Sequence, residues 1–187
     1  TVEPKTALNQ WINQHMIPAP KEAEQNREFY YMSDFLKDHG FDHYEISNFC
    51  LPGLHSRHNS SYWTEKQYLG RGPSAHSYNG ISRQWNVASL DKYIEGISSG
   101  NPTFEVEELD LYTRYNDFVI THIRTQWGMP LPKLGKQYGE ELYKYCLHMA
   151  TPHLQQGTLE IKNDTLKLTR KGVVISDGIM SDMLWVE

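Results

Sequence analysis

The segment LYTRYNDFVITHI, residues 111–123, decides the fold more than any other part of this 187-residue sequence. Its apolar, aromatic and histidine side chains recur at intervals of three and four residues, at Leu111, Tyr115, Phe118, Val119, His122 and Ile123. That spacing is typical of an amphipathic helix with a wide apolar stripe. We therefore expect a helix over 111–123 whose apolar face is buried by neighbouring elements.

A β-hairpin is predicted further along the chain. In TLEIKNDTLKLT, residues 158–169, apolar and polar residues alternate on either side of an Asn163-Asp164 pair, which suits a two-residue turn. This register pairs Leu159 with Leu168, and Ile161 with Leu166. With a helix expected around 140–149 and a last helix around 179–184, the region has a winged-helix-like order of elements.

The residues before 100 predict a mixture of helices and strands. Helical spacing is found within 5–16, and a longer helix is expected from just after Pro20 to Gly40, a residue that suits a helix C-terminus. The strand-like segment HYEIS, residues 43–47, follows directly. A helix, a glycine and a strand in this order are typical of α/β folds with a parallel sheet. The polar, turn-rich segment 98–105 is expected to be a linker.

Composition excludes several classes of protein. Apolar residues make up 39% of the chain and charged residues 22%, as in ordinary globular proteins. The formal net charge of −5 provides no basic field for a phosphate backbone, so no nucleic-acid partner is expected. With only Cys50 and Cys146, and with no signal or membrane-spanning pattern, we expect a reduced, cytoplasmic protein. The chain begins with Thr1 rather than Met, which suggests a piece of a longer protein.

Residues 47–86 carry most of the chemistry, and their pattern predicts little regular structure apart from short strand-like segments over 67–69 and 82–87. In HNSSYW, the residues His58, Asn59, Tyr62 and Trp63 place an imidazole, a carboxamide, a phenol and an indole within six positions. Such a set could ligate a metal or stack on a flat, conjugated ligand. Alternatively, Asn59 caps a turn while the two rings fill an edge of the core. A short helix over 89–97, capped by Ser89, follows this tract.

The segment LGRGPSAHS, residues 69–77, places two glycines close together, so that its backbone could approach a ligand closely. It lacks the spacing and the lysine of phosphate-binding loops, and a tight turn at the end of a sheet is the alternative. Cys50 lies near His55 and His58 in the sequence. No base–orienter pattern accompanies it, so a thiol catalyst is not expected.

Four longer segments are similar to one known family. They are YEISNF (44–49), RHNSSYW (57–63), YLGRGPSAHSY (68–78) and RQWN (83–86). Together they resemble the second half of the HemW family, haem chaperones among the radical S-adenosylmethionine (SAM) proteins that are often named oxygen-independent coproporphyrinogen III oxidase-like. The resemblance implies an α/β fold. Residues 1–100 would form the closing part of a partial (β/α) radical SAM barrel, and residues 101–187 a small α+β, winged-helix-like C-terminal domain.

The resemblance also implies cofactors. Family members bind S-adenosylmethionine and hold a [4Fe–4S] cluster on a C-x-x-x-C-x-x-C loop. That loop is absent here, so we expect no catalytic residue in this chain, and we expect the cluster and S-adenosylmethionine only in a full-length parent protein. The glycine-rich segment matches one that lies near S-adenosylmethionine in relatives. Its candidate contacts are Gly72, Ser74, Ala75 and His76.

HNSSYW matches the family's H-N-x-x-Y-W motif, which is associated with haem binding. The resemblance therefore implies that His58 is an axial ligand of haem iron, with Asn59, Tyr62 and Trp63 as further haem contacts. The expected function is to bind haem or a porphyrin and to transfer haem to acceptor proteins. The alternative is oxidative decarboxylation of coproporphyrinogen III to protoporphyrinogen IX. A winged-helix DNA-binding module is a third class, disfavoured by the acidic charge.

Overall fold

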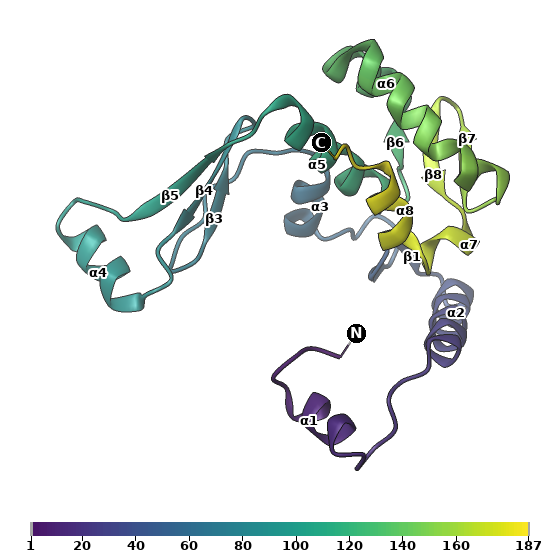
Figure 1. Ribbon diagram of the computed structural model, residues 1–187, viewed down its shortest axis with the longest axis horizontal. Coiled ribbons are helices and arrows are strands. Elements are labelled where there is room, and N and C mark those ends of the chain that lie inside the picture. Colours follow the sequence, from purple (N-terminus) through teal and green to yellow (C-terminus); the bar gives the residue numbers. More distant parts are fainter. Residues whose placement is uncertain (1, 187) are drawn as a thin grey trace. The chain divides into compact units, whose positions relative to one another are not determined.

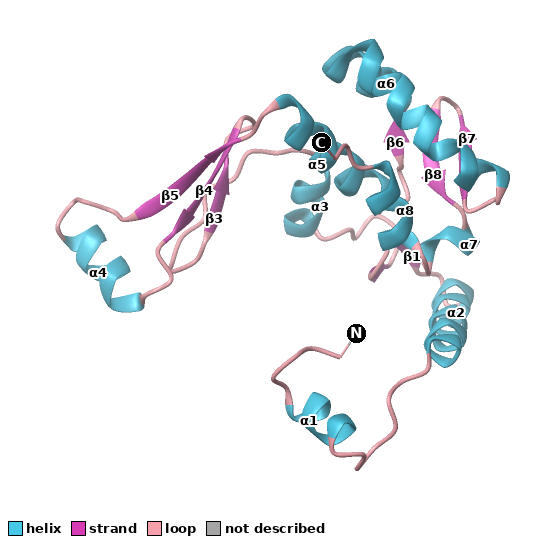
Figure 2. Cartoon of the chain, in the orientation of Figure 1, coloured by secondary structure: helices cyan, strands magenta, loops and turns pink. Residues whose placement is uncertain are grey.

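The computed structural model describes residues 2–186, which divide into two compact units, one up to Phe41 and one from Asp42 onward. Figures 1 and 2 show the elements. The helices are α1 (Ala7–Asn13), α2 (Glu22–Asp38), α3 (Arg57–Trp63), α4 (Leu90–Ser98), α5 (Leu111–Ile123), α6 (Leu131–Gln155), α7 (Arg170–Val173) and α8 (Ser176–Met183). The strands are β1 (Asp42–Glu45), β2 (Asn48–Cys50), β3 (His76–Tyr78), β4 (Ser82–Asn86), β5 (Phe104–Glu108), β6 (Met129–Pro130), β7 (Leu159–Lys162) and β8 (Thr165–Leu168).

The first unit contains the two helices expected before residue 41. The Thr6 side chain caps α1 by accepting a hydrogen bond from the backbone N–H of Asn9 at 3.2 Å. Helix α2 ends at Asp38, and Gly40 follows with a φ of 80°, a left-handed conformation that glycine adopts without strain. None of the described helices is both long enough and apolar enough to cross a membrane.

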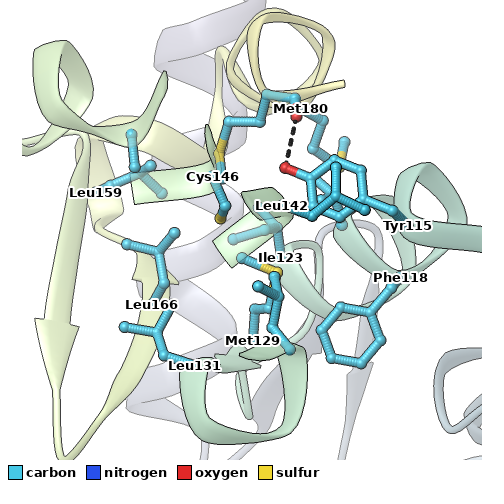
Figure 3. Close-up of a cluster of buried hydrophobic side chains, with 14 of the residues drawn as sticks. Tyr115, Phe118, Ile123, Met129, Leu131, Leu142, Cys146, Leu159, Leu166 and Met180 are labelled. Atoms are coloured by element: carbon cyan, nitrogen blue, oxygen red, sulfur yellow. Dashed lines mark hydrogen bonds between the residues drawn. The ribbon is translucent and has the colours of Figure 1, made fainter. Parts of the chain in front are cut away.

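Helix α5 forms over the residues predicted for it and lies at the centre of the hydrophobic core (Figure 3). Asp110 caps its N-terminus by accepting from the backbone N–H of Thr113 at 2.7 Å. Tyr115, Phe118 and Ile123 have no exposed surface. The buried Tyr115 hydroxyl donates to the carbonyl oxygen of Met183 at 3.0 Å, so α5 and α8 are joined by a polar contact inside an apolar core.

The predicted hairpin and its register are confirmed. Leu159 pairs with Leu168 and Ile161 with Leu166, and both turn residues, Asn163 and Asp164, have positive φ angles as a type I′ turn requires. Strand β8 also pairs with β6, which completes a three-stranded antiparallel sheet in the order β6-β8-β7. Leu159 and Leu166 are buried against α5 and α6, whereas Ile161, next to the turn, is 46% exposed.

Helix α6 is much longer than the helix predicted over 140–149. It begins at Leu131 and bends at Gly139, whose φ of 85° lies outside the helical region. It also continues through Pro152 to Gln155. The predicted helix was too short because Gly139 and Pro152 both resemble helix ends in sequence. In the structure, buried side chains before and after the bend pack the two segments of α6 against the same core.

A second antiparallel sheet contains β3, β4 and β5 in that order. The strand predicted over 82–87 is β4, and the Ser89 cap predicted for α4 is present, with the Ser89 hydroxyl accepting from the backbone N–H of Lys92 at 3.4 Å. The linker predicted over 98–105 was partly wrong. From Phe104 the chain forms β5 and pairs with β4 along its whole length, because main-chain partners on β4 are available there.

The strand predicted over 43–47 forms over Asp42–Glu45, but the parallel pairing expected for it was wrong. Strand β1 ends at Glu45 and reverses into β2, and each strand pairing within residues 2–186 is antiparallel. The reversal is fixed by the buried Glu45 carboxylate, which accepts hydrogen bonds from the backbone N–H of Ser47 at 3.1 Å and from the Asn48 amide. The expected α/β class is confirmed by the mixed architecture and by the structural comparison below. The domain boundary at residue 100 remains a prediction.

Replacing Leu166 with alanine should lower the free energy of unfolding by about 2–5 kcal/mol, because Leu166 is fully buried and a cavity would remain. Its cross-strand partner Ile161 is the matched control. Ile161→Ala should cost less than about 1 kcal/mol, since the side chain is largely solvated. Urea unfolding of both variants measures the difference. Equal losses would show that the hairpin face does not pack as described.

Stability should also depend on His122. Burial, together with the nearby Lys133 charge, lowers the pKa of His122 below its ordinary value of 6.5. The unfolded chain then binds more protons below about pH 6.5, so the free energy of unfolding falls as the pH drops through this window. His122→Leu should flatten the fall between about pH 7.5 and about 5. Urea titrations across that range test it, and an unchanged slope would contradict the assignment.

Candidate functional site

The HNSSYW segment lies in helix α3 rather than in irregular structure. The Ser56 hydroxyl caps this helix by accepting from the backbone N–H of Asn59 at 3.2 Å. The prediction of an irregular tract over 47–86 was therefore wrong at this point. A serine three residues before an asparagine is common in protein sequences. Because α3 has only seven residues, this capping signal alone did not indicate a helix.

Two of the four expected haem contacts share one face of α3. His58 and Tyr62 are four residues apart, and the Tyr62 hydroxyl lies 3.1 Å from Nε2 of His58. Their rings meet edge to face, with centroids 5.1 Å apart. His58 is exposed and Tyr62 is 38% exposed, so this face is accessible to a ligand.

Asn59 and Trp63 lie on the neighbouring face, also four residues apart, and both are half-buried. The Arg124 guanidinium, from the end of α5, is stacked over the Trp63 ring at 4.4 Å from its centre. The indole N–H of Trp63 is buried and has no hydrogen-bond partner. Trp63 thus contributes to the packing of α3, and a contact with haem remains a prediction for Asn59 and Trp63.

The residues of α3 fit a single axial ligand of haem iron. His58 offers one accessible imidazole, and no group of three or more histidine, cysteine or acidic side chains in residues 2–186 could hold a metal ion by itself. Tyr62 lines a cavity of about 140 Å³, less than the roughly 300 Å³ of a typical ligand pocket. A porphyrin would therefore have to use the exposed face of α3 as well.

This cavity has a polar floor between α5 and the β3–β4–β5 sheet. Asp117 of α5 forms an ion pair with Arg83 of β4, and Glu107 of β5 lies 3.8 Å from the same guanidinium. Burial raises the pKa of Asp117 above its usual range, and Arg83 offsets part of that rise. Burial likewise raises the pKa of Tyr68 and Tyr78, so both phenols stay protonated.

The expected S-adenosylmethionine contacts divide into two groups. The backbone of Gly72 is occupied, because its N–H donates to the Tyr93 hydroxyl and its carbonyl accepts from the Asn86 amide, both at 3.0 Å. Ala75 is similarly held by backbone hydrogen bonds to Gly72 and Asn86. Ser74 and His76 instead line a cavity of about 390 Å³, where the His76 ring stacks with Trp85. Of the four expected contacts, only Ser74 and His76 line that cavity.

The cysteines of this chain do not fit a [4Fe–4S] cluster. Cys146 is fully buried in the core, and burial raises its pKa to about 11, so the thiol is not a ready metal ligand. Cys50 is on β2, and its pKa is also raised, first by burial and then by Asp42. Neither thiol is part of a possible metal-binding group in the described residues.

Sequence reasoning missed a larger cavity beside α3, which shares Lys66 with the cavity of about 140 Å³. It measures about 600 Å³ and is lined by His55, Arg57, Lys66, Trp127, two serines of α3 and Thr64, the residue that ends the helix. Residues 57, 60, 61 and 64 have helical spacing, which would have indicated a common face if a helix had been predicted there. Trp127 comes from the turn after α5, and no local pattern could have indicated its place.

Comparison with known proteins gives a family match for part of the chain and a solved structure of similar fold. Residues 109–175 match the family described as the HemN C-terminal domain. The structure resembles that of coproporphyrinogen III oxidase (HemN) from Escherichia coli, reported as a radical SAM enzyme, with a TM-score of 0.68 over 88% of this chain and 42% of that one. At 15% sequence identity, this likeness shows the fold alone.

The sequence relatives are more specific. Heme chaperone HemW from Mycobacterium tuberculosis is 32% identical over 98% of this chain and 45% of its own length. HemW from Bacillus subtilis is 26% identical over 98% of this chain and 48% of its own. The mouse protein named radical S-adenosyl methionine domain-containing protein 1, mitochondrial, is 26% identical over 98% of this chain and 44% of its own. The resemblance to the C-terminal half of HemW proteins is thus confirmed, and the chain spans less than half the length of these relatives.

The ion pair between Arg83 and Asp117 should hold β4 against α5. Arg83→Met should lower the free energy of unfolding by about 1–3 kcal/mol, because the half-buried Asp117 loses its partner. The double variant Arg83→Met with Asp117→Leu should recover most of this loss. Urea unfolding of both single variants and the double variant gives the coupling energy. Purely additive losses would show that the two side chains do not interact.

Proposed function

We propose that this chain is part of a HemW-type protein that binds haem through α3 and transfers it to acceptor proteins. The observation that carries the proposal is the exposed His58 on a helix whose sequence fits H-N-x-x-Y-W, with Tyr62 beside its imidazole. An accessible neutral imidazole is a common ligand of haem iron. The relatives at 32% and 26% identity, both named heme chaperones, support this function.

In this proposal each α3 side chain has a separate part. His58 would supply Nδ1 to the iron, while its Nε2 stays 3.1 Å from the Tyr62 hydroxyl, which orients the imidazole. The two aromatic rings next to it, Tyr62 and Tyr68, meet edge to face at 5.0 Å and offer an apolar edge for a flat macrocycle. Trp63 keeps α3 in place through Arg124. Haem would supply the iron and the ring that are passed on to the acceptor.

The other cofactors are assigned to the full-length protein. The sequence here contains no C-x-x-x-C-x-x-C loop, so the [4Fe–4S] cluster and most contacts to S-adenosylmethionine would be contributed by residues outside this chain. Ser74 and His76 are proposed as this chain's contacts to S-adenosylmethionine, since they line the cavity of about 390 Å³. Gly72 and Ala75 would support them by fixing the turn.

Coproporphyrinogen III oxidation is the second candidate function, and the fold likeness to HemN supports it. The two candidates differ in what α3 must do. A chaperone needs an iron ligand on this chain, whereas coproporphyrinogen contains no iron to coordinate. The exposed His58 therefore favours the chaperone.

Haem titration of the full-length protein tests the proposal. We expect His58→Ala to shift the Soret band and to weaken haem binding by at least about tenfold, because the iron loses a protein ligand. His148→Ala is the matched control, since His148 is also an exposed histidine on a helix of this chain. An identical Soret band in the wild-type protein and in His58→Ala would show that another residue binds the iron.

A further inference from the structure

The cavity of about 600 Å³ beside α3 has the charge of an anion-binding site. Arg57 and Lys66 both line it, and no acidic side chain does. Neither cation takes part in an ion pair within residues 2–186. By contrast, the nearby Lys133 is neutralised by Glu65. Two unpaired cations on one concave surface attract a carboxylate or a similar anion.

One hydroxyl in the cavity is available as a donor. The Ser61 hydroxyl donates to the carbonyl of Arg57 at 2.7 Å, and the Thr64 hydroxyl donates to the carbonyl of Ser60 at 2.9 Å, so both of their protons are occupied. The Ser60 hydroxyl is different. It is buried, and it has no hydrogen-bond partner. A buried donor without a partner is costly, and turning this hydroxyl toward the cavity would let a ligand oxygen satisfy it.

The opposite wall is aromatic. The rings of His55 and Trp127 lie 5.4 Å apart, and His55 is held edge to face by Tyr44 at 5.0 Å. Trp127 is 45% exposed, a large apolar surface left open to solvent. Cationic and hydroxyl groups on one side and exposed rings on the other suit a ligand that has both carboxylate groups and a flat, unsaturated body.

This cavity adjoins the face of α3 that carries His58. Arg57 precedes His58 directly, and successive residues of an α-helix are about 100° apart around its axis. Lys66 lines both this cavity and the smaller one that contains Tyr62. A ligand held by His58 at its centre could therefore reach the larger cavity with a flexible acidic side arm.

We propose that the cavity of Arg57, Ser60 and Lys66 binds the propionate carboxylates of the haem whose iron is bound by His58. This assignment rests on the proposed function and adds to it a subsite that selects for free carboxylates. Arg57 and Lys66 supply charge-assisted hydrogen bonds, and Ser60 supplies a neutral one. The rings of His55 and Trp127 contact the part of the macrocycle next to the propionates.

The test compares haem with haem dimethyl ester, in which both propionates are esterified and uncharged. Each is titrated in the same detergent into the full-length protein and into the double variant Arg57→Gln, Lys66→Gln, with the Soret band as readout. We expect the wild-type protein to bind haem about tenfold more tightly than the ester. The double variant should lose this preference by binding haem about tenfold more weakly, with its affinity for the ester and its Soret position unchanged.

A second double variant, Lys92→Gln with Lys162→Gln, controls for the loss of two positive charges, since both lysines are exposed and lie outside the cavity. It should keep the wild-type preference for haem. If Arg57→Gln, Lys66→Gln also keeps that preference while His58→Ala changes the Soret band, the carboxylate subsite is wrong and the proposed function stands. If the wild-type protein binds neither haem nor its ester, the proposed function and the subsite are both wrong.

Discussion

The placement of α3 depends on one guanidinium group. Arg124 donates to the Glu45 carboxylate at 2.7 Å, and Glu45 is only 2% exposed. The same guanidinium lies over the ring of Trp63. One side chain at the end of α5 therefore joins β1, α5 and α3. Without Arg124, a buried carboxylate would lack its counter-charge, which is among the more costly defects in a folded protein. The candidate haem ligand on α3 is thus positioned by an interaction on the neighbouring face of the helix.

Local patterns were sufficient to predict the core. The stripe over 111–123 identified α5, because a long helix repeats its signal several times. The hairpin register followed from the alternation around Asn163 and Asp164, since a two-residue turn leaves no freedom in pairing. These elements fold around each other, so their sequence pattern and their tertiary contacts agree.

The elements that were predicted wrongly are those that are stabilised by contacts with distant parts of the chain. Helix α3 has seven residues and one capping hydrogen bond, too little for a stable helix without partners. Its partner Arg124 is 61 positions after Trp63. The reversal after β1 likewise depends on the Glu45 carboxylate, which accepts a hydrogen bond from the backbone N–H of Ser47. The pattern of apolar residues gives no sign of such a hydrogen bond. For the site, the sequence placed His58 and Tyr62 in one six-residue motif, and the helix brings their side chains together, but it could not indicate Trp127, which lines the larger cavity.

The helix also gives a physical reason for the spacing of H-N-x-x-Y-W. The motif consists of two interleaved pairs, each four residues apart: His58 with Tyr62, and Asn59 with Trp63. The first pair is exposed, and the second is half-buried against the rest of the unit, with Trp63 under Arg124. A ligand bound to the exposed pair would leave the second pair undisturbed. One short helix can therefore exchange a ligand on one face while the other face keeps it anchored, as the proposed transfer of haem between partners would require.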